Sequence, residues 1–350
     1  MYDGELTRQR RVGFCVGRSF LHFPTRGGVE NRCWGLVKNR TSLRDAKMTA
    51  QRQTDSNVPT DSVELVEPLR ISAPLAYRRA MAGCPRDMAG VGYGCYSYHG
   101  IWQYLRLFKF VEAVGADSSF YIDAFREMAR DKKHRVLISG TADYGMLAQI
   151  LHGFGLEGCA PDVQVVDLCE TPLYLNRWYA ERLRVSLKTT QAHILQFDAH
   201  PVDLICTHSF MHNFRSADRP SLVSKWYQLL RPGGKVVLTN SLRDTTPALT
   251  RKYTSDEALV LRDGVRKAAQ AHSSSIDLDP EALAEIAFDF ATRRRRYNLR
   301  TIQEVRELFE GGGFRFEQLF ELPVTMRRDS PATSLGSPKM RVHVVATRPR

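Results

Sequence analysis

Five short apolar runs between residues 135 and 238 constrain the fold of this chain more than any other feature of its sequence. They are residues 135–139 (RVLIS), 163–167 (VQVVD), 193–197 (HILQF), 203–206 (DLIC) and 234–238 (GKVVL). Each run has the length of a buried strand and is followed by a polar turn, which predicts a sheet of parallel strands. Open sheets of this kind bind ligands at the carboxyl ends of their strands, so we expect these turns to form one site.

The sequence divides into three parts around this sheet. Residues 1–62 have no helical or strand periodicity and predict a basic, disordered extension with a polar linker. Residues 63–133 predict a helical cap, with helices at 69–81, 101–114 and 118–130. Residues 134–350 predict the α/β domain, with a helical insertion at 243–300 (helices 255–271 and 280–296), a helix at 301–310 and final strands at 314–322 and 340–347.

Composition excludes several classes of protein. No apolar run approaches the ~20 residues of a membrane span, so we expect a soluble, cytoplasmic protein without a membrane partner. The seven cysteines, at positions 15, 33, 84, 95, 159, 169 and 206, include no CxxC pair and no metal-ligand spacing with histidine. They therefore predict reduced thiols and no metal site. The oligomeric state stays open, with a homodimer as one alternative.

The positive charge is concentrated in a few places. The formal net charge is +12, and residues 1–52 hold eleven Lys and Arg against four Asp and Glu. A second cluster is the run of four arginines at 293–296. This distribution favours a basic tail and one solvated helix face over a nucleic-acid groove. We therefore expect a small-molecule substrate rather than a nucleic-acid partner.

Glycine and acidic residues occupy the turns after the first three predicted strands. Residues 139–145 (SGTADYG) join a strand to a helix, and a glycine there lets a ligand reach the backbone amides at the helix start. Asp167 ends the second strand, where a carboxylate can accept from both hydroxyls of a ribose. Asp198 ends the third predicted strand and can accept from an adenine amine. For each of these features, a plain tight turn or a helix cap is the structural alternative.

These motifs, with residues 229–234 (LLRPGG) and a Gly-Gly-Phe turn at 312–314, resemble the class I S-adenosylmethionine-dependent methyltransferases over roughly residues 133–348. The resemblance implies an α/β fold with a Rossmann-like, seven-stranded, doubly wound sheet whose last strand is antiparallel. It also implies S-adenosylmethionine as the cofactor. The cofactor site implied by the resemblance comprises Ser139, Gly140, Ala142, Asp143, Tyr144, Gly145, Asp167, Leu168, Asp198, Ala199 and His208.

The first turn departs from the family's usual pattern, which is an acid, one residue and then Gly-x-Gly-x-Gly. Aligned on the first glycine, the chain has Ile138 in place of the acid, Ala142 in place of the second glycine and Tyr144 in place of the third. Tyr144 is expected to put bulk near the methionine part of the cofactor. Asp143 or Ser139 would then contact the cofactor's amino group.

The turn after the fourth strand contains two histidines. Residues 207–214 (THSFMHNF) lie where these methyltransferases place groups that face the transferring methyl. A histidine with a pKa near 6.5 can remove a proton from a hydroxyl, amine or thiol at neutral pH. We therefore expect His208 or His212 to be catalytic, with a structural or cofactor-contacting role as the alternative.

Residues 92–104 are dense in aromatic side chains. The amino-terminal helices of this family often close over the cofactor and the substrate. Tyr98, His99, Trp102 and Tyr104 are therefore predicted to bind substrate, and their rings offer a surface for the sulfonium charge. Ordinary packing of an amphipathic helix is the alternative.

The combined features predict methyl transfer from S-adenosylmethionine to an O, N or S nucleophile of a small molecule, in specialised metabolism. The positive charge leaves an RNA methyltransferase as one alternative. The altered first turn leaves another, a fold relative that binds the cofactor without transferring a methyl group.

Overall fold

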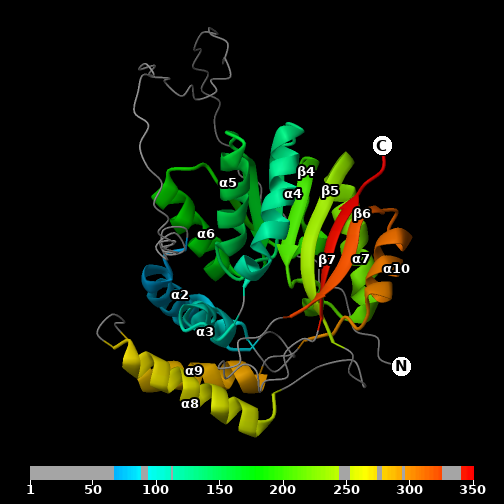
Figure 1. Cartoon of the computed structure of the whole chain (residues 1–350). Helices are drawn as coiled ribbons and strands as arrows, with labels where there is room; N and C mark the ends of the chain where they lie inside the picture. Colours follow the sequence, from blue (N-terminus) through cyan, green and yellow to red (C-terminus); the bar gives the residue numbers. More distant parts are fainter. Residues whose placement is uncertain are drawn as a thin grey trace, which may run out of the picture. The chain divides into compact units, whose positions relative to one another are not determined.

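A seven-stranded sheet forms the centre of the molecule (Figure 1), in the order β3-β2-β1-β4-β5-β7-β6. Its strands are β1 (Arg135–Ser139), β2 (Asp162–Asp167), β3 (Lys188–Gln191), β4 (Val202–His208), β5 (Leu230–Leu242), β6 (Arg315–Pro323) and β7 (Met340–Thr347). The first five strands are parallel, and β7 is antiparallel to both of its neighbours. This confirms the predicted Rossmann-like doubly wound sheet with an antiparallel last strand.

The computed structural model describes residues 67–87, 94–111, 113–243, 253–273, 278–293, 296–324 and 340–350. All of them belong to one unit, Leu43–Arg350. The expected disordered extension and linker, residues 1–62, lie outside the described residues. Within the described part of the chain, no helix has both the length and the apolar character of a membrane span.

The predicted position of the third strand is wrong. The apolar run at 193–197 forms a short 3-10 turn, Ile194–Gln196, while β3 is the more polar segment Lys188–Gln191. β3 is one of the two edge strands of the described sheet, where it pairs with β2. Its side chains are at most half-buried, so it carries no apolar pattern that could have marked it.

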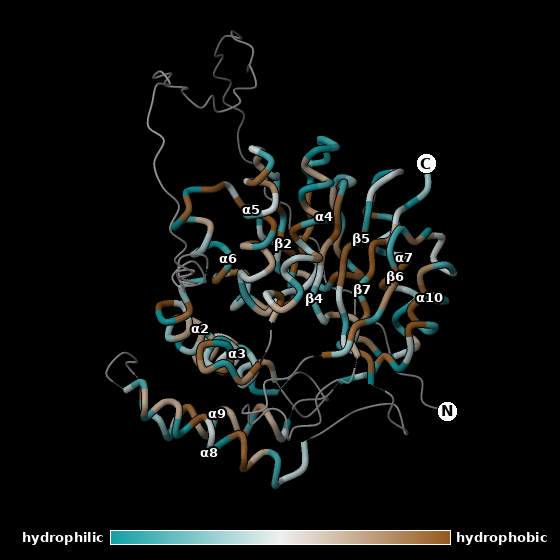
Figure 2. The backbone as a smooth tube through the Cα atoms, in the orientation of Figure 1, coloured by the Kyte–Doolittle hydropathy of each residue, from teal (hydrophilic) through white to brown (hydrophobic). Residues whose placement is uncertain are grey.

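Two layers of helices cover the faces of the sheet. On one face lie α4 (Ser118–Arg130), α5 (Gly145–Leu156) and α6 (Glu170–Leu183), and on the other lie α7 (Arg219–Leu229) and α10 (Ile302–Gly311). Alternate residues of each central strand enter the two cores, as the two-residue period of a strand requires. Figure 2 shows hydrophobic segments running through the sheet between these layers.

The expected helical cap, residues 63–133, divides between two structures. Its last helix, α4, packs on the sheet through Tyr121, Phe125 and Met128 and so belongs to the α/β layer. The cap itself consists of α2 (Leu69–Gly83) and α3 (Tyr96–Leu107), and α3 begins five residues earlier than predicted.

The insertion supplies two helices that pack on this cap. They are α8 (Ser255–Ala271), which begins with a capping box at Thr254, and α9 (Pro280–Arg293). Leu261 and Val265 of α8 share a buried cluster with Ile101 and Leu105 of α3. Figure 1 shows α2, α3, α8 and α9 together, beyond one end of the strands. The insertion is therefore part of the same enclosure as the cap.

Candidate functional site

A cavity of about 1040 Å³ lies at the carboxyl ends of the parallel strands. Its walls come from the turns after β1, β2, β3 and β4, from α3 of the cap, and from α8 and α9 of the insertion. This is the edge at which open α/β sheets bind their ligands. Its volume is at the upper end of the range for small-molecule sites, so a nucleoside cofactor and a small acceptor both fit within it.

The turn after β1 depends on Gly140. Its φ of +69° is in the left-handed region, where a side chain is strained. A Cβ at this position would lie 2.1 Å from the ring of Phe210, a residue of the turn after β4. The glycine amide donates to the carbonyl oxygen of Val166 over 2.8 Å, which ties the turn to β2. Only glycine fits here, and the cavity reaches the backbone at this point.

Asp167 ends β2 and faces the cavity, as predicted. The amide of Thr141 donates to its Oδ2 over 2.9 Å, and the amide of Cys169 donates to its Oδ1 over 2.8 Å. Burial raises the pKa of Asp167 to about 6, although the nearby His99 and the two amides work in the opposite direction. Each carboxylate oxygen keeps one lone pair for a further donor. The group therefore fits the two hydroxyls of a ribose.

Asp143 joins the first turn to the cap through a buried ion pair. Its Oδ2 accepts from Arg106 of α3 over 2.6 Å, and its Oδ1 accepts from the amide of Gly145 over 2.7 Å. Arg106 also donates to Glu67. Burial alone would lower the pKa of Arg106, but the two carboxylates outweigh it and raise the pKa. The pair lies in the cavity wall beside Ala142, where the amino-acid end of the cofactor is expected.

Three residues that were expected to contact the cofactor do not line the cavity. The hydroxyl oxygen of Ser139 accepts from the indole of Trp226 in the core. Tyr144 stacks on Tyr179 at a centroid distance of 4.5 Å, and its hydroxyl lies 2.8 Å from that of Ser72 in α2. Neither residue lines the cavity, and Gly145 does not line it either. The expectation that Tyr144 crowds the methionine part of the cofactor is therefore wrong, because the helix start turns its ring into the core.

The structure does not bring Asp198 to the cavity. Its side chain is 92% exposed and pairs with Lys225 over 3.1 Å, and neither Asp198 nor Ala199 lines the cavity. The error follows from the misplaced third strand. The residues after the true β3 that line the cavity are Gln191, Ala192 and His193. A polar edge strand gives no apolar period, so the sequence carried no signal for them.

His208 ends β4 and lies in the cavity wall, as predicted. Its Nε2 is 3.5 Å from Oδ2 of Asp117, a buried residue before α4. Burial lowers the pKa of His208, against the opposing effect of Asp117. Arg341 and His343 of β7 donate to the same carboxylate over 2.9 and 3.1 Å. Burial alone would raise the pKa of Asp117, but His208, His343 and Arg341 outweigh it and hold this pKa well below its usual range. His208 is therefore a neutral imidazole held beside a fixed carboxylate.

The remaining predicted site residues divide between the cavity and the core. Leu168, half of whose side chain is exposed, and His212 line the cavity. Tyr98, His99 and Trp102 of α3 line it too. Tyr104, on the opposite side of that helix, is fully buried in the cluster between the cap and the insertion. For Tyr104 the alternative of helix packing holds.

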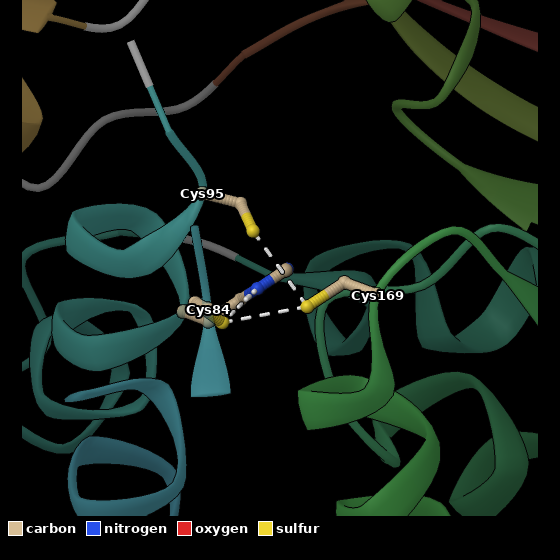
Figure 3. Close-up of side chains that lie close together, drawn as sticks. Cys84, Cys95 and Cys169 are labelled. Carbon is tan, nitrogen blue, oxygen red and sulfur yellow. Dashed lines mark hydrogen bonds between the residues drawn. The ribbon is translucent and has the colours of Figure 1, made fainter. Parts of the chain in front are cut away.

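Four potential metal ligands meet at one end of this cavity. Cys84, Cys95, His99 and Cys169 offer three sulfurs and one ring nitrogen that all lie within 4.8 Å of one another. Figure 3 shows the sulfurs of the three labelled cysteines directed toward one another. The sequence predicted no metal site because only Cys95 and His99 lie close together in the sequence, and one such pair does not make a metal-ligand pattern. Cys169 is 74 positions beyond Cys95, and only the fold brings it near.

Comparison with known proteins identifies the domain that carries this cavity. A family model described as "Methyltransferase domain" matches residues 143–238. No curated protein matches the chain by sequence.

Several solved structures are similar to the chain at low sequence identity. The S-adenosylmethionine-dependent methyltransferase SibL, in its apo form, is 16% identical over 82% of this chain and 69% of its own, with a TM-score of 0.43. A methyltransferase of this kind from Clostridium acetobutylicum is 9% identical over 73% and 100%, with a TM-score of 0.45. Magnesium protoporphyrin IX methyltransferase from Synechocystis, with bound S-adenosylhomocysteine, is 10% identical over 82% and 100%, with a TM-score of 0.41.

The family match covers the turns after β2 and β4 and the LLRPGG segment. A nucleoside fits at Asp167 and at the glycine turn. Residues 143–238 of the chain are therefore similar to a methyltransferase domain.

Proposed function

We propose that this enzyme methylates an O, N or S nucleophile of a small molecule, in specialised metabolism, with His208 as the general base. The observation that carries the proposal is the position of His208, which shares one cavity with Asp167 and is held beside Asp117. A histidine placed next to a buried carboxylate has a stabilised imidazolium form once it accepts a proton.

S-adenosylmethionine supplies an electrophilic methyl group on a sulfonium sulfur when it is bound. Asp167 would hold the ribose hydroxyls, and Asp143, fixed by Arg106, would accept from the amino group. His208 would take the proton that the acceptor loses as its lone pair bonds to the methyl carbon, and Asp117 would stabilise the resulting charge. Most of the acceleration would come from positioning the acceptor in line and from excluding water.

The lining of the cavity supports a small acidic acceptor. Among the described residues that line it, the cationic side chains Arg106, Lys109, Arg215, Arg243, Arg293, Arg296 and Arg341 outnumber the acidic Asp143, Asp167, Glu170 and Asp218. Four of these arginines, at positions 215, 243, 293 and 296, belong to the turn after β4 or to the insertion and its ends. An acceptor with a carboxylate or phosphate group is favoured by such a field.

The alternatives are less well supported. An RNA acceptor needs an open groove, whereas α3 and α9 contribute to the wall of this cavity. The alternative of a fold relative that does not transfer methyl comes from the altered first turn, and the bulkiest of the three altered residues, Tyr144, packs its ring in the core.

The test is a methylation assay on the full chain with a panel of acceptors, in which each carboxylic acid is paired with its neutral ester. We expect S-adenosylhomocysteine and a methylated product to form, with the acids preferred. His208→Gln should lower kcat by about 10²–10⁴-fold and leave cofactor affinity unchanged. The matched control is His200→Gln, since His200 is exposed and does not line the cavity. Full activity of His208→Gln would rule out its role as the base.

A further inference from the structure

Two segments far apart in the sequence bring four metal-binding groups together beside the cofactor site. Cys84 caps the end of α2, Cys95 precedes α3, and His99 lies one helical turn later on the same face. Cys169 comes from the other segment, at the position that caps the start of α6. The ligand set is therefore three sulfurs and one imidazole, the composition of many structural zinc sites.

Three distances within the cluster are close to the edges of a zinc tetrahedron. The Cys84 and Cys169 sulfurs are 3.4 Å apart, and the Cys95 and Cys169 sulfurs are 3.6 Å apart. Nδ1 of His99 is 3.4 Å from the sulfur of Cys84. Zinc bonds of about 2.3 Å to sulfur and 2.0 Å to nitrogen give edges of about 3.8 and 3.5 Å. A disulfide needs sulfurs about 2.05 Å apart, so these contacts are not disulfides.

We propose that Cys84, Cys95, His99 and Cys169 bind one Zn²⁺ ion in a tetrahedral structural site. Three thiolates and an imidazole suit zinc and not the hard cations Mg²⁺ and Ca²⁺. Four protein ligands fill the tetrahedron, so no position is left open for water or substrate. The ion holds the cap and does not take part in methyl transfer.

The backbone around the ligands is packed as such a site requires. A Cβ on Gly94 would lie 1.8 Å from the carbonyl oxygen of Pro85, so the chain next to Cys95 runs directly against the chain next to Cys84. The hydroxyl of Thr171 lies 3.1 Å from the sulfur of Cys84, within reach to donate to a thiolate. Such outer hydrogen bonds orient metal ligands in known sites.

The site would link the cap to the part of the cofactor pocket that holds the ribose. The amide of Cys169 donates to Asp167, and the side chain of Cys169 would be a zinc ligand. The ion would therefore fix both the α2–α3 corner and the turn that presents the ribose carboxylate. Loss of zinc should loosen the cap and weaken cofactor binding together.

The test measures metal directly and does not depend on methyl transfer. The full chain, purified under reducing conditions, is analysed for metal by mass spectrometry and then reloaded with Co²⁺ after chelation. We expect one zinc per chain, and a cobalt spectrum with thiolate charge-transfer bands and the d–d bands of a tetrahedral site. Cys169→Ser and Cys84→Ser should each lose most of the bound zinc. The matched control is Cys159→Ser, because Cys159 is half-buried, lies outside the cluster and should leave zinc content unchanged.

The wild-type measurement decides the proposal even if a variant fails to fold. Wild-type protein that takes up neither zinc nor cobalt would overturn it, and so would a disulfide between two of these cysteines found by peptide mapping. Zinc retained at full stoichiometry in a folded Cys169→Ser variant would also overturn it. A chelator-dependent drop in Tm, reversed by zinc and absent in Cys169→Ser, would support it.

Discussion

Replacing Asp167 with asparagine should weaken cofactor binding. Two of the carboxylate's lone pairs are used by the amides of Thr141 and Cys169, and one on each oxygen remains for the ribose. The amide of asparagine removes one acceptor oxygen and the charge. One charge-assisted hydrogen bond of about 1.5–3 kcal/mol is lost, and the other becomes a weaker neutral bond. The expected cost is about 2–4 kcal/mol, a 30- to 1000-fold rise in Kd.

The assay is calorimetric titration of the full chain with S-adenosylhomocysteine, with Tm measured on the same samples to confirm folding. Asp198→Asn is the matched control, because Asp198 is exposed and outside the cavity and should bind like the wild type. A folded Asp167→Asn variant with wild-type affinity would refute the assignment of the ribose site. Weakened binding in Asp198→Asn would show that the adenine contact lies where the sequence first placed it.

Three further perturbations test other parts of the site. Gly140→Ala adds a Cβ 2.1 Å from the overlying phenyl ring in a left-handed residue, so Tm and cofactor affinity should both fall, and an unchanged Tm would contradict this. Burial lowers the pKa of His208 below the ordinary histidine value of about 6.5, and the base is active when neutral, so the profile of kcat/KM should fall only below about pH 6.5. A fall that begins above pH 6.5 would argue against this base. Asp117→Asn leaves the buried Arg341 without its charged partner and should cost about 3–5 kcal/mol of unfolding free energy in a denaturant titration, whereas the exposed Asp123→Asn should cost little.

The sheet was predictable where strands are buried on both faces. Runs such as 135–139 and 203–206 are apolar because helices cover both sides of β1 and β4. β3 at the edge of the sheet lacks that constraint, so its polar residues gave no signal and the nearby apolar turn at 194–196 was taken for a strand. The misplacement of Asp198 follows directly from this, because Asp198 was expected in the site only as the residue that ends this predicted strand.

Local sequence motifs predicted single residues at the ends of strands that line the cavity, such as Gly140, Asp167 and His208. The groups that complete these turns come from distant segments. Asp117 reaches His208 from the start of α4, and Arg106 reaches the first turn from the cap. No spacing rule connects such pairs, because the packing of helices on the sheet sets their distances.

The altered first turn explains how the cap is attached to the rest of the enzyme. Tyr144 stands where a glycine is usual, and its ring stacks in the core while its hydroxyl meets Ser72 of α2. The neighbouring Asp143 binds Arg106 of α3 in a buried ion pair, which would be costly to break. The first turn therefore contacts both helices of the cap, through Tyr144, which departs from the family pattern, and through its neighbour Asp143. We accordingly expect changes in the cap to be felt at the predicted cofactor site.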